Sequence, residues 1–145
     1  GSLSGTDTTY SAFFKRLGIC RVATPSEFVE LLKFLTIAGV PAGQKIAGFT
    51  CSGGGATMLA DYAAPLELDF VQPSSHTAAA LTQLLPHTAT VTNPLDYTTP
   101  IWGDYERTLP VFKCLLEDGY DSAVLVQDYP SAGLDRPGQA ERSAA

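Results

Sequence analysis

A glycine-rich turn is the feature of this sequence best suited to chemistry. The segment Thr50–Thr57, with glycines at positions 53, 54 and 55, lies between a short apolar run over residues 45–49 and a helical pattern over residues 58–64. A chain that turns through glycines from a strand into a helix exposes backbone N–H groups at the helix start, where the helix dipole also favours negative charge. The turn therefore predicts either a phosphate or carboxylate site or a tight structural corner.

The turn matches neither of the two common nucleotide fingerprints. A P-loop requires a lysine after its glycines, and none follows here. A dinucleotide fingerprint requires three glycines in the pattern GxGxxG. Gly53 and Gly55 supply the first two, whereas Met58 takes the third place, and the suitably spaced acidic residue Asp69 does not restore the pattern.

A second polar segment, Asn93–Pro100, follows an expected strand and precedes a helical pattern. It carries hydrogen-bond donors on Asn93, Tyr97, Thr98 and Thr99. Asp96 is either a cap for a helix or turn or a group that orients a ligand. If both polar segments lie at one edge of a sheet, together they make a more convincing anion site than either does alone.

The histidines and cysteines point to no further chemistry. We expect His76 to face solvent in the first turn of a helix, and His87 has no cysteine or carboxylate at metal-ligand spacing. The three cysteines, Cys20, Cys51 and Cys114, are odd in number and widely spaced, which favours reduced thiols and a cytoplasmic protein. No metal site is expected.

The first forty residues predict two helices with a short strand between them. Apolar residues recur at helical spacing over residues 10–17, and Gly18 follows as a stop signal. The apolar run over residues 19–22 is a candidate strand. Thr24 and Glu27 then form a capping box that opens a second amphipathic helix, with a proline at its first position.

Strands and helices alternate beyond a Gly/Pro-rich break. This alternation predicts a parallel sheet covered by helices on both sides, with ligands at the carboxyl ends of the strands. The last strand is continuously apolar, as in a strand buried on both faces. Pro110 implies that the last helix is kinked there or begins near Thr108. We expect strands over residues 45–51, 66–71, 89–92 and 123–126, and helices over residues 55–64, 73–85 and 105–116.

Composition excludes several classes of function. The chain has 145 residues, 45% of them hydrophobic, and a formal net charge of −6. It is long enough for one core, but its nine basic residues are too scattered to bind nucleic acid. Its apolar runs fall far short of the roughly 20 residues that span a bilayer, and its N-terminus does not resemble a signal peptide.

The order of these pieces resembles the NDP-forming acyl-CoA synthetases, which are relatives of succinyl-CoA synthetase and include acetate–CoA ligases. Gly1–Asp7, which reads GSLSGTD, resembles the segment just after the family's phosphorylated histidine. Residues 18–27 resemble the closing strand and helix of the first ligase domain. Ile46–Ala56, followed by the NPLD sequence at Asn93–Asp96, resembles the next, flavodoxin-like domain. Cys51 departs from the family's usual asparagine, and residues 56–57 depart from its usual Pro-Gly.

The resemblance implies an α/β fold: a flavodoxin-like parallel sheet with flanking helices, here incomplete, preceded by the C-terminal strand and helices of a similar ligase domain. Residues 1–38 would end the first domain, residues 39–44 would be a linker, and residues 45–130 would form the flavodoxin-like domain. Residues 131–145 would be a disordered tail. The chain would therefore be an internal fragment.

The family interconverts acyl-CoA, ADP and phosphate with a free acid, CoA and ATP, through acyl phosphate and a phosphohistidine. The resemblance thus implies ATP/ADP, CoA and Mg²⁺ as cofactors of the full-length enzyme, none of them bound by this chain alone. It also implies a small organic acid substrate and partnership with CoA-binding and ATP-grasp domains. The phosphohistidine would lie upstream of Gly1, so this chain would hold no catalytic residue and would be inactive by itself.

On this interpretation the two polar segments would form the surface on which the phosphoryl group docks. The residues expected to line it are Ser52, Gly53, Gly54, Gly55, Asn93, Asp96 and Thr98. The alternative is a non-catalytic flavodoxin-like binding or interaction module, in which the glycine turn is only a corner or holds a small anion. A flavin-binding domain is weaker still, because no Ser/Thr-rich phosphate loop follows the first strand.

Overall fold

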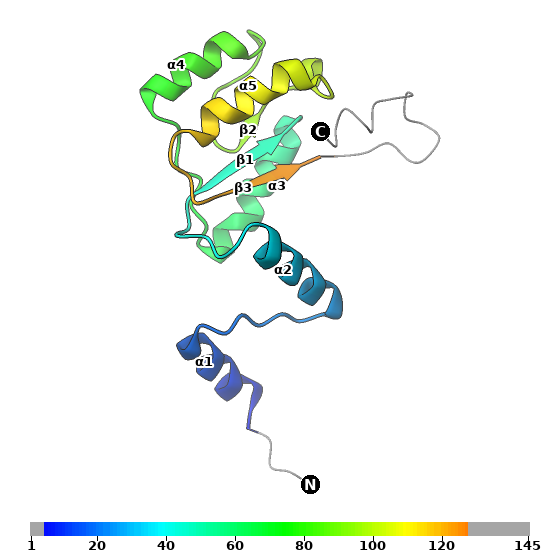
Figure 1. Ribbon diagram of the computed structural model, residues 1–145, viewed down its shortest axis with the longest axis vertical. Coiled ribbons are helices and arrows are strands. Elements are labelled where there is room, and N and C mark those ends of the chain that lie inside the picture. The colour runs from blue at the N-terminus through cyan, green and yellow to red at the C-terminus, as the bar shows by residue number, and fades with distance from the viewer. Residues whose placement is uncertain (1–4, 128–145) are drawn as a thin grey trace, which may run out of the picture. The chain divides into compact units, whose positions relative to one another are not determined.

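The computed structural model describes residues 5–127 of the chain. Contacts within the chain divide it into two compact units, Gly1–Val40 and Pro41–Ala145 (Figure 1). The tail expected over residues 131–145 lies outside the described residues. Within those residues, no helix combines the length and the apolar character that crossing a bilayer requires.

Two helices make up the described part of the first unit, α1 (Asp7–Leu17) and α2 (Pro25–Ile37). The helix predicted from the apolar spacing over residues 10–17 is confirmed, and Gly18 ends it in the left-handed conformation at φ 67°. The strand predicted over residues 19–22 is wrong, because that segment has no strand partner among the described residues. Arg21 instead donates to the Asp7 carboxylate and to Ser11 in α1.

The capping box predicted for α2 is present. The Thr24 hydroxyl accepts from the backbone N–H of Glu27 at 3.2 Å, and Pro25 takes the first helical position. The Glu27 carboxylate reaches back to the N–H of Ala23 at 2.7 Å, one residue before the cap. Two N–H groups at this helix start are thereby satisfied by side chains.

The second unit is built on a small parallel sheet, and the α/β prediction is confirmed (Figure 1). Its strands are β1 (Ile46–Thr50), β2 (Leu95–Asp96) and β3 (Ser122–Val126), in the order β2-β1-β3. In register, Thr50 lies opposite Asp96 on one side and Val126 on the other. β1 is therefore the central strand of the described sheet.

Helices cover both faces of β1. A Cβ at Gly48 would lie 2.9 Å from Leu59 of α3 (Gly53–Ala63). The ring centroid of the next residue, Phe49, lies 4.5 Å from that of Phe112 in α5 (Tyr105–Leu116). Successive residues of a strand point to opposite faces, so α3 and α5 lie on opposite sides. α4 (Ser75–Leu84) packs beside α5. The main core lies between β1, α4 and α5: Ala47, Phe49, Leu81, Leu85, Leu95, Tyr97, Ile101, Val111 and Leu115.

The strand predicted over residues 66–71 is wrong. A short 3-10 helix, η1 (Ala64–Leu66), is followed by a single parallel bridge between Lys45 and Asp69. Beyond the bridge, the side chain of Asn93 lies between this segment and β1: its amide donates to the carbonyls of Ile46 at 2.7 Å and Val71 at 2.9 Å. A side chain thus replaces the ladder that would have made the segment a strand.

Two other expectations are corrected. The strand predicted over residues 89–92 does not form, because the segment that pairs with β1 lies further along, in β2. β3 is not buried on both faces: Ala123 and Leu125 are exposed, and Leu125 keeps 45% of its surface open. The helix predicted over residues 105–116 is confirmed as α5: it begins at Tyr105, which excludes the start near Thr108, and it includes the exposed Pro110.

Candidate functional site

The structure brings the two predicted polar segments together at the carboxyl edge of the sheet. β1 and β2 run parallel and end beside each other, with Thr50 opposite Asp96. The N–H of Tyr97 donates to the Thr50 carbonyl at 2.9 Å. The Thr99 hydroxyl donates to the Cys51 carbonyl at 3.3 Å. The segment after β2 is thereby held against the turn that leads into α3.

The turn ends in a capped helix start. Ser52 is the N-cap of α3, and its hydroxyl oxygen accepts from the N–H of Gly55 at 3.1 Å, while its carbonyl accepts from Ala56. The N–H groups of Gly53 and Gly54 donate no hydrogen bond within residues 5–127. Both residues are exposed. Two backbone donors at the positive end of the helix dipole are therefore available to a ligand.

The three glycines of the turn have different reasons to be glycine. A Cβ at Gly55 would lie 2.3 Å from the Thr50 hydroxyl oxygen, so the fold excludes a larger residue there. A Cβ at Gly53 would meet only the Asp96 carboxylate at 3.7 Å, and one at Gly54 would meet nothing within 4 Å. Neither residue has a positive φ. Glycine in a helix costs about 0.5–1 kcal/mol relative to alanine, so the fold alone does not account for these two.

Asp96 places a carboxylate near this helix start. One oxygen accepts from the N–H of Thr98 at 2.9 Å, which makes Asp96 a cap of its own turn. The other lies near Gly53, at the positive end of α3, where a carboxylate is stabilised. The Asp96 carboxylate can only accept hydrogen bonds when ionised, so it repels a phosphoryl oxygen and attracts an N–H donor. Of the two roles the sequence left open, the structure supports the turn cap directly.

Thr98 is held in an unusual conformation. Its φ and ψ are 71° and 144°, in a region that β-branched residues rarely adopt and that costs of order 1–3 kcal/mol. Its hydroxyl oxygen is buried without a hydrogen-bond partner, as is the indole nitrogen of Trp102, just after the 3-10 helix η2 (Thr99–Ile101). Sequence reasoning missed Trp102, although a single tryptophan beside a polar loop was a visible signal.

Asn93 does not join the site. It is 3% exposed, its side-chain oxygen accepts from the N–H of Gly48 at 2.9 Å, and its amide donates to two carbonyls. Its backbone N–H is not available to donate to a ligand either, since it donates to the side-chain oxygen of Gln72 at 3.0 Å. Every polar group of its side chain is occupied. Asn93 therefore positions the segment that carries Asp96 and Thr98 and presents nothing to a ligand.

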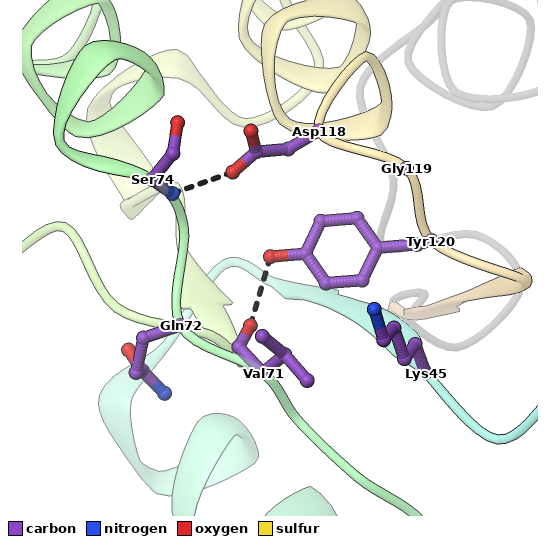
Figure 2. Close-up of a pocket in the computed structure, with 7 residues that line it drawn as sticks. All are labelled: Lys45, Val71, Gln72, Ser74, Asp118, Gly119 and Tyr120. Atoms are coloured by element: carbon purple, nitrogen blue, oxygen red, sulfur yellow. Dashed lines mark hydrogen bonds between the residues drawn. The ribbon is translucent and has the colours of Figure 1, made fainter.

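A hollow of about 200 Å³ lies at the amino ends of β1 and β3, away from the start of α3 (Figure 2). The Asp118 carboxylate accepts from the N–H of Ser74, the N-cap of α4, at 2.6 Å, and this bond lowers the pKa of Asp118. The Tyr120 hydroxyl donates to the Val71 carbonyl at 2.8 Å, and burial raises the pKa of Tyr120. A carboxylate already occupies this helix start, so the hollow is not a second anion site.

The remaining candidate groups lie apart from the site. His76 is exposed in the first turn of α4, as predicted. Burial raises the pKa of the Cys114 thiol, and no disulfide joins the cysteines within residues 5–127. In the same residues, no three histidine, cysteine or acidic side chains gather where they could hold a metal ion.

Comparison with curated proteins places the chain beside two archaeal ligases. It is 34% identical over 96 residues to an ADP-forming acetate–CoA ligase of Methanocaldococcus jannaschii, which covers 66% of this chain and 14% of the relative. It is 33% identical over 119 residues to the alpha subunit of ADP-forming acetate–CoA ligase II of Pyrococcus furiosus, which covers 81% of this chain and 25% of the relative. The chain thus spans a quarter or less of these relatives. No family model matches it.

Solved structures share the fold. A crystal structure of a Pyrococcus horikoshii OT3 protein matches 97% of this chain with a TM-score of 0.76 and 29% identity, over 32% of its own length. The dinucleotide-forming acetyl-coenzyme A synthetase 1 of Ca. Korarchaeum cryptofilum, solved with phosphate and ADP, matches 99% of the chain with a TM-score of 0.70 and 19% identity, over 36% of its length. At that identity the second match speaks to the fold alone.

Proposed function

Because this chain belongs to the NDP-forming acyl-CoA synthetases, the family of the ADP-forming acetate–CoA ligases, we propose that it is part of an enzyme of that activity. The enzyme would interconvert acyl-CoA, ADP and phosphate with a free acid, CoA and ATP. Within it, the carboxyl edge of the sheet would receive a phosphoryl group that another segment carries on a histidine.

The observation that carries this proposal is the pair of unbonded N–H groups at the start of α3. Within residues 5–127, the N–H groups of Gly53 and Gly54 donate no hydrogen bond, and no neighbouring atom requires either residue to be glycine. Backbone N–H groups at a helix start stabilise a phosphoryl dianion without a basic surface. That is the kind of site open to a chain whose net charge is −6.

The chemistry of each side chain suggests its part. The N–H groups of Gly53 and Gly54 and the Ser52 hydroxyl would donate to phosphoryl oxygens. Gly55 would shape the turn, since its own N–H is bonded to Ser52. The Asp96 carboxylate would accept from the free N–H of the imidazole ring that carries the phosphoryl group. The ring would then face an acceptor, and the phosphoryl oxygens would face the N–H donors.

The rest of the reaction would belong to other parts of the enzyme. We assign ATP/ADP, Mg²⁺ and CoA to the ATP-grasp and CoA-binding domains that the family implies, and the small organic acid to a site outside this helix start. Mg²⁺ would neutralise charge on the transferred phosphoryl group there. The described residues of this chain would orient and shield the phosphoryl group while it waits on the histidine.

Replacement of Gly54 by leucine in the enzyme that contains this chain tests the proposal. The new side chain enters open space, so α3 should still form, but it would cover the two N–H donors. We expect phosphohistidine formation and acyl-CoA synthesis to fall about 100-fold, the usual cost of misplacing a reacting group. The matched control is Ala64→Leu, which adds the same side chain at the exposed, opposite end of α3.

Phosphohistidine is measured with radiolabelled ATP, and acyl-CoA by its thioester absorbance. Wild-type levels of both in Gly54→Leu, with Ala64→Leu also unchanged, would contradict the docking role. That result would favour the alternative, a non-catalytic binding module.

A further inference from the structure

One flank of α3 is apolar and open to solvent. Met58 and Tyr62, which are four residues apart and so lie on one side of the helix, are 58% and 71% exposed. Of the exposed residues that the structure describes in α3, only Asp61 is charged. The helix on the other face of the sheet, α5, exposes three charged side chains: Glu106, Arg107 and Lys113. Because a surface helix normally turns charged residues to water, this flank of α3 has the character of a covered surface.

The apolar flank of α3 faces the β3 side of the sheet. A Cβ at Gly53 would lie 3.7 Å from the Asp96 carboxylate, so the side of α3 that carries Gly53 faces β2. At 3.6 residues per turn, Met58 and Tyr62 project about 140° and 180° around the helix from Gly53. Since β2 and β3 lie on opposite sides of β1, that direction leads toward β3.

β3 is also open on the face that α3 covers elsewhere. In register, Val126 lies beside Thr50, and a Cβ at Gly55 of α3 would clash with the Thr50 hydroxyl oxygen. Residues that pair in register point to the same face of a sheet, so Val126 lies on the α3 side. It is nonetheless 38% exposed. Met58, Tyr62 and Val126 therefore belong to one open apolar surface, which we call the α3–β3 surface.

The geometry of the α3–β3 surface favours a helix as its occupant. Parallel sheets are covered by helices on both faces, and α3 packs on β1 and β2. A helix beside α3 would bury both Tyr62 and Val126, whereas a strand added at the edge of β3 would leave Tyr62 uncovered. The relatives described above are longer than this chain, so the rest of the enzyme can supply such a helix.

We propose that the α3–β3 surface is an interface, and that its occupant is an amphipathic helix from a part of the enzyme outside this chain. The helix would lie beside α3 and turn apolar residues at helical spacing toward Tyr62 and Val126. The inference rests on the proposed function only for the existence of that larger enzyme. It does not require a phosphoryl group to dock at Gly53 and Gly54.

Photo-crosslinking in the enzyme that contains this chain tests the proposal. The photoreactive residue p-benzoylphenylalanine replaces Tyr62, the enzyme is irradiated, and the cross-linked peptides are identified by mass spectrometry. We expect one main product, between position 62 and a peptide outside residues 1–145 whose apolar residues recur at helical spacing. The matched control carries the same photoreactive residue at Ala79, an exposed position of α4, and should not cross-link to that peptide.

A second pair of variants tests the apolar character of the interface. With the photoreactive residue at Met58 instead, Tyr62→Glu should lower the yield of the same product about tenfold, because a buried carboxylate without a partner disfavours the contact. Ala79→Glu should leave that yield unchanged. A yield that Tyr62→Glu does not lower would contradict the proposed interface.

Three other results would overturn the inference: a product that joins two copies of this chain, a product confined to residues 1–145, or no product above that of the Ala79 control. The Gly54→Leu enzyme decides the proposed function separately. Loss of phosphohistidine in that enzyme, together with no product from position 62, would overturn this inference and leave the proposed function standing.

Discussion

Alanine at Gly55 and alanine at Gly54 should change stability in opposite directions, although the two glycines are neighbours. A Cβ at Gly55 would lie 2.3 Å from the hydroxyl oxygen of Thr50 and 3.2 Å from its Cβ, so one of the groups must move by about 1 Å. Thr50 is 2% exposed on the central strand, and β-branching leaves its side chain few rotamers. The contact therefore cannot be relieved cheaply.

The change in the free energy of unfolding is the sum of the cost of the close contact and the gain from replacing glycine in a helix. Overpacking of this kind destabilises a protein by about 1–3 kcal/mol. Replacing glycine by alanine in a helix stabilises it by about 0.5–1 kcal/mol. We expect Gly55→Ala to lower the free energy of unfolding by about 1–2 kcal/mol. Gly54→Ala, which meets nothing within 4 Å, should raise it by about 0.5 kcal/mol. The two midpoints should differ by about 1 M urea for a typical slope of about 2 kcal/mol/M.

Urea unfolding followed by the fluorescence of Trp102 measures both variants, since this single tryptophan lies in the unit that contains the sheet. The double variant Thr50→Ala/Gly55→Ala is the check on cause: without the hydroxyl, the cost of alanine at position 55 should fall by at least half. A midpoint for Gly55→Ala equal to or above that of Gly54→Ala would refute the reasoning from the close contact.

Two further predictions concern groups that hold the second unit together. Asn93→Ala should lower the free energy of unfolding by about 2–4 kcal/mol, because it leaves the N–H of Gly48 and two carbonyls buried without their partner; a loss below about 1 kcal/mol in urea unfolding would contradict this. Asp118→Asn should destabilise the protein at neutral pH, since the bond from Ser74 lowers the pKa of Asp118. This stabilisation is present above the unfolded-state pKa of about 3.9 and is lost as the pH falls through the lower folded-state value, so the difference from wild type, measured from pH 7 to 2.5, should vanish at the acid end.

The elements that the sequence predicted well are those determined by local interactions. α1, α2 and α4 follow from apolar spacing and from caps within four residues of their starts, such as Thr24 with Glu27. The strand, turn and helix around the glycines were predicted in the same way. The meeting of the two polar segments at one edge also followed, because parallel strands end on the same side of a sheet.

The errors concern apolar runs whose state depends on distant partners. Residues 66–71 and 89–92 have strand composition, yet neither finds a continuous ladder. The side chain of Asn93 decides the first case through bonds to residues 22 and 47 positions away, which no local pattern contains. From its place in a polar segment, Asn93 was predicted to bind a ligand. In the structure, its side chain is bonded to backbone groups instead.

The position of the candidate site at the end of β1 could be predicted from the sequence, but the properties of its residues could not. Glycine spacing located the helix start, but the sequence cannot distinguish Gly55, which packing requires, from Gly54, which it does not. Nor can it show that Thr98 has a positive φ or that the indole nitrogen of Trp102 lacks a partner. These properties depend on the tertiary contacts of the segment after β2, such as the bond from the Thr99 hydroxyl to the Cys51 carbonyl.

The bonds of Asn93 have a consequence for how the length of this chain can vary. They fix the start of the segment that contains Asp96 directly to β1, independently of the loop that comes before. Insertions at the exposed residues His87 and Thr88 should therefore leave the helix start of α3 and its neighbours in place. One residue added between Asn93 and Asp96 would instead turn alternate side chains to the opposite face. Residues 87–88 are thus where a reporter or an epitope can be inserted, and the short stretch after them is where length must be kept.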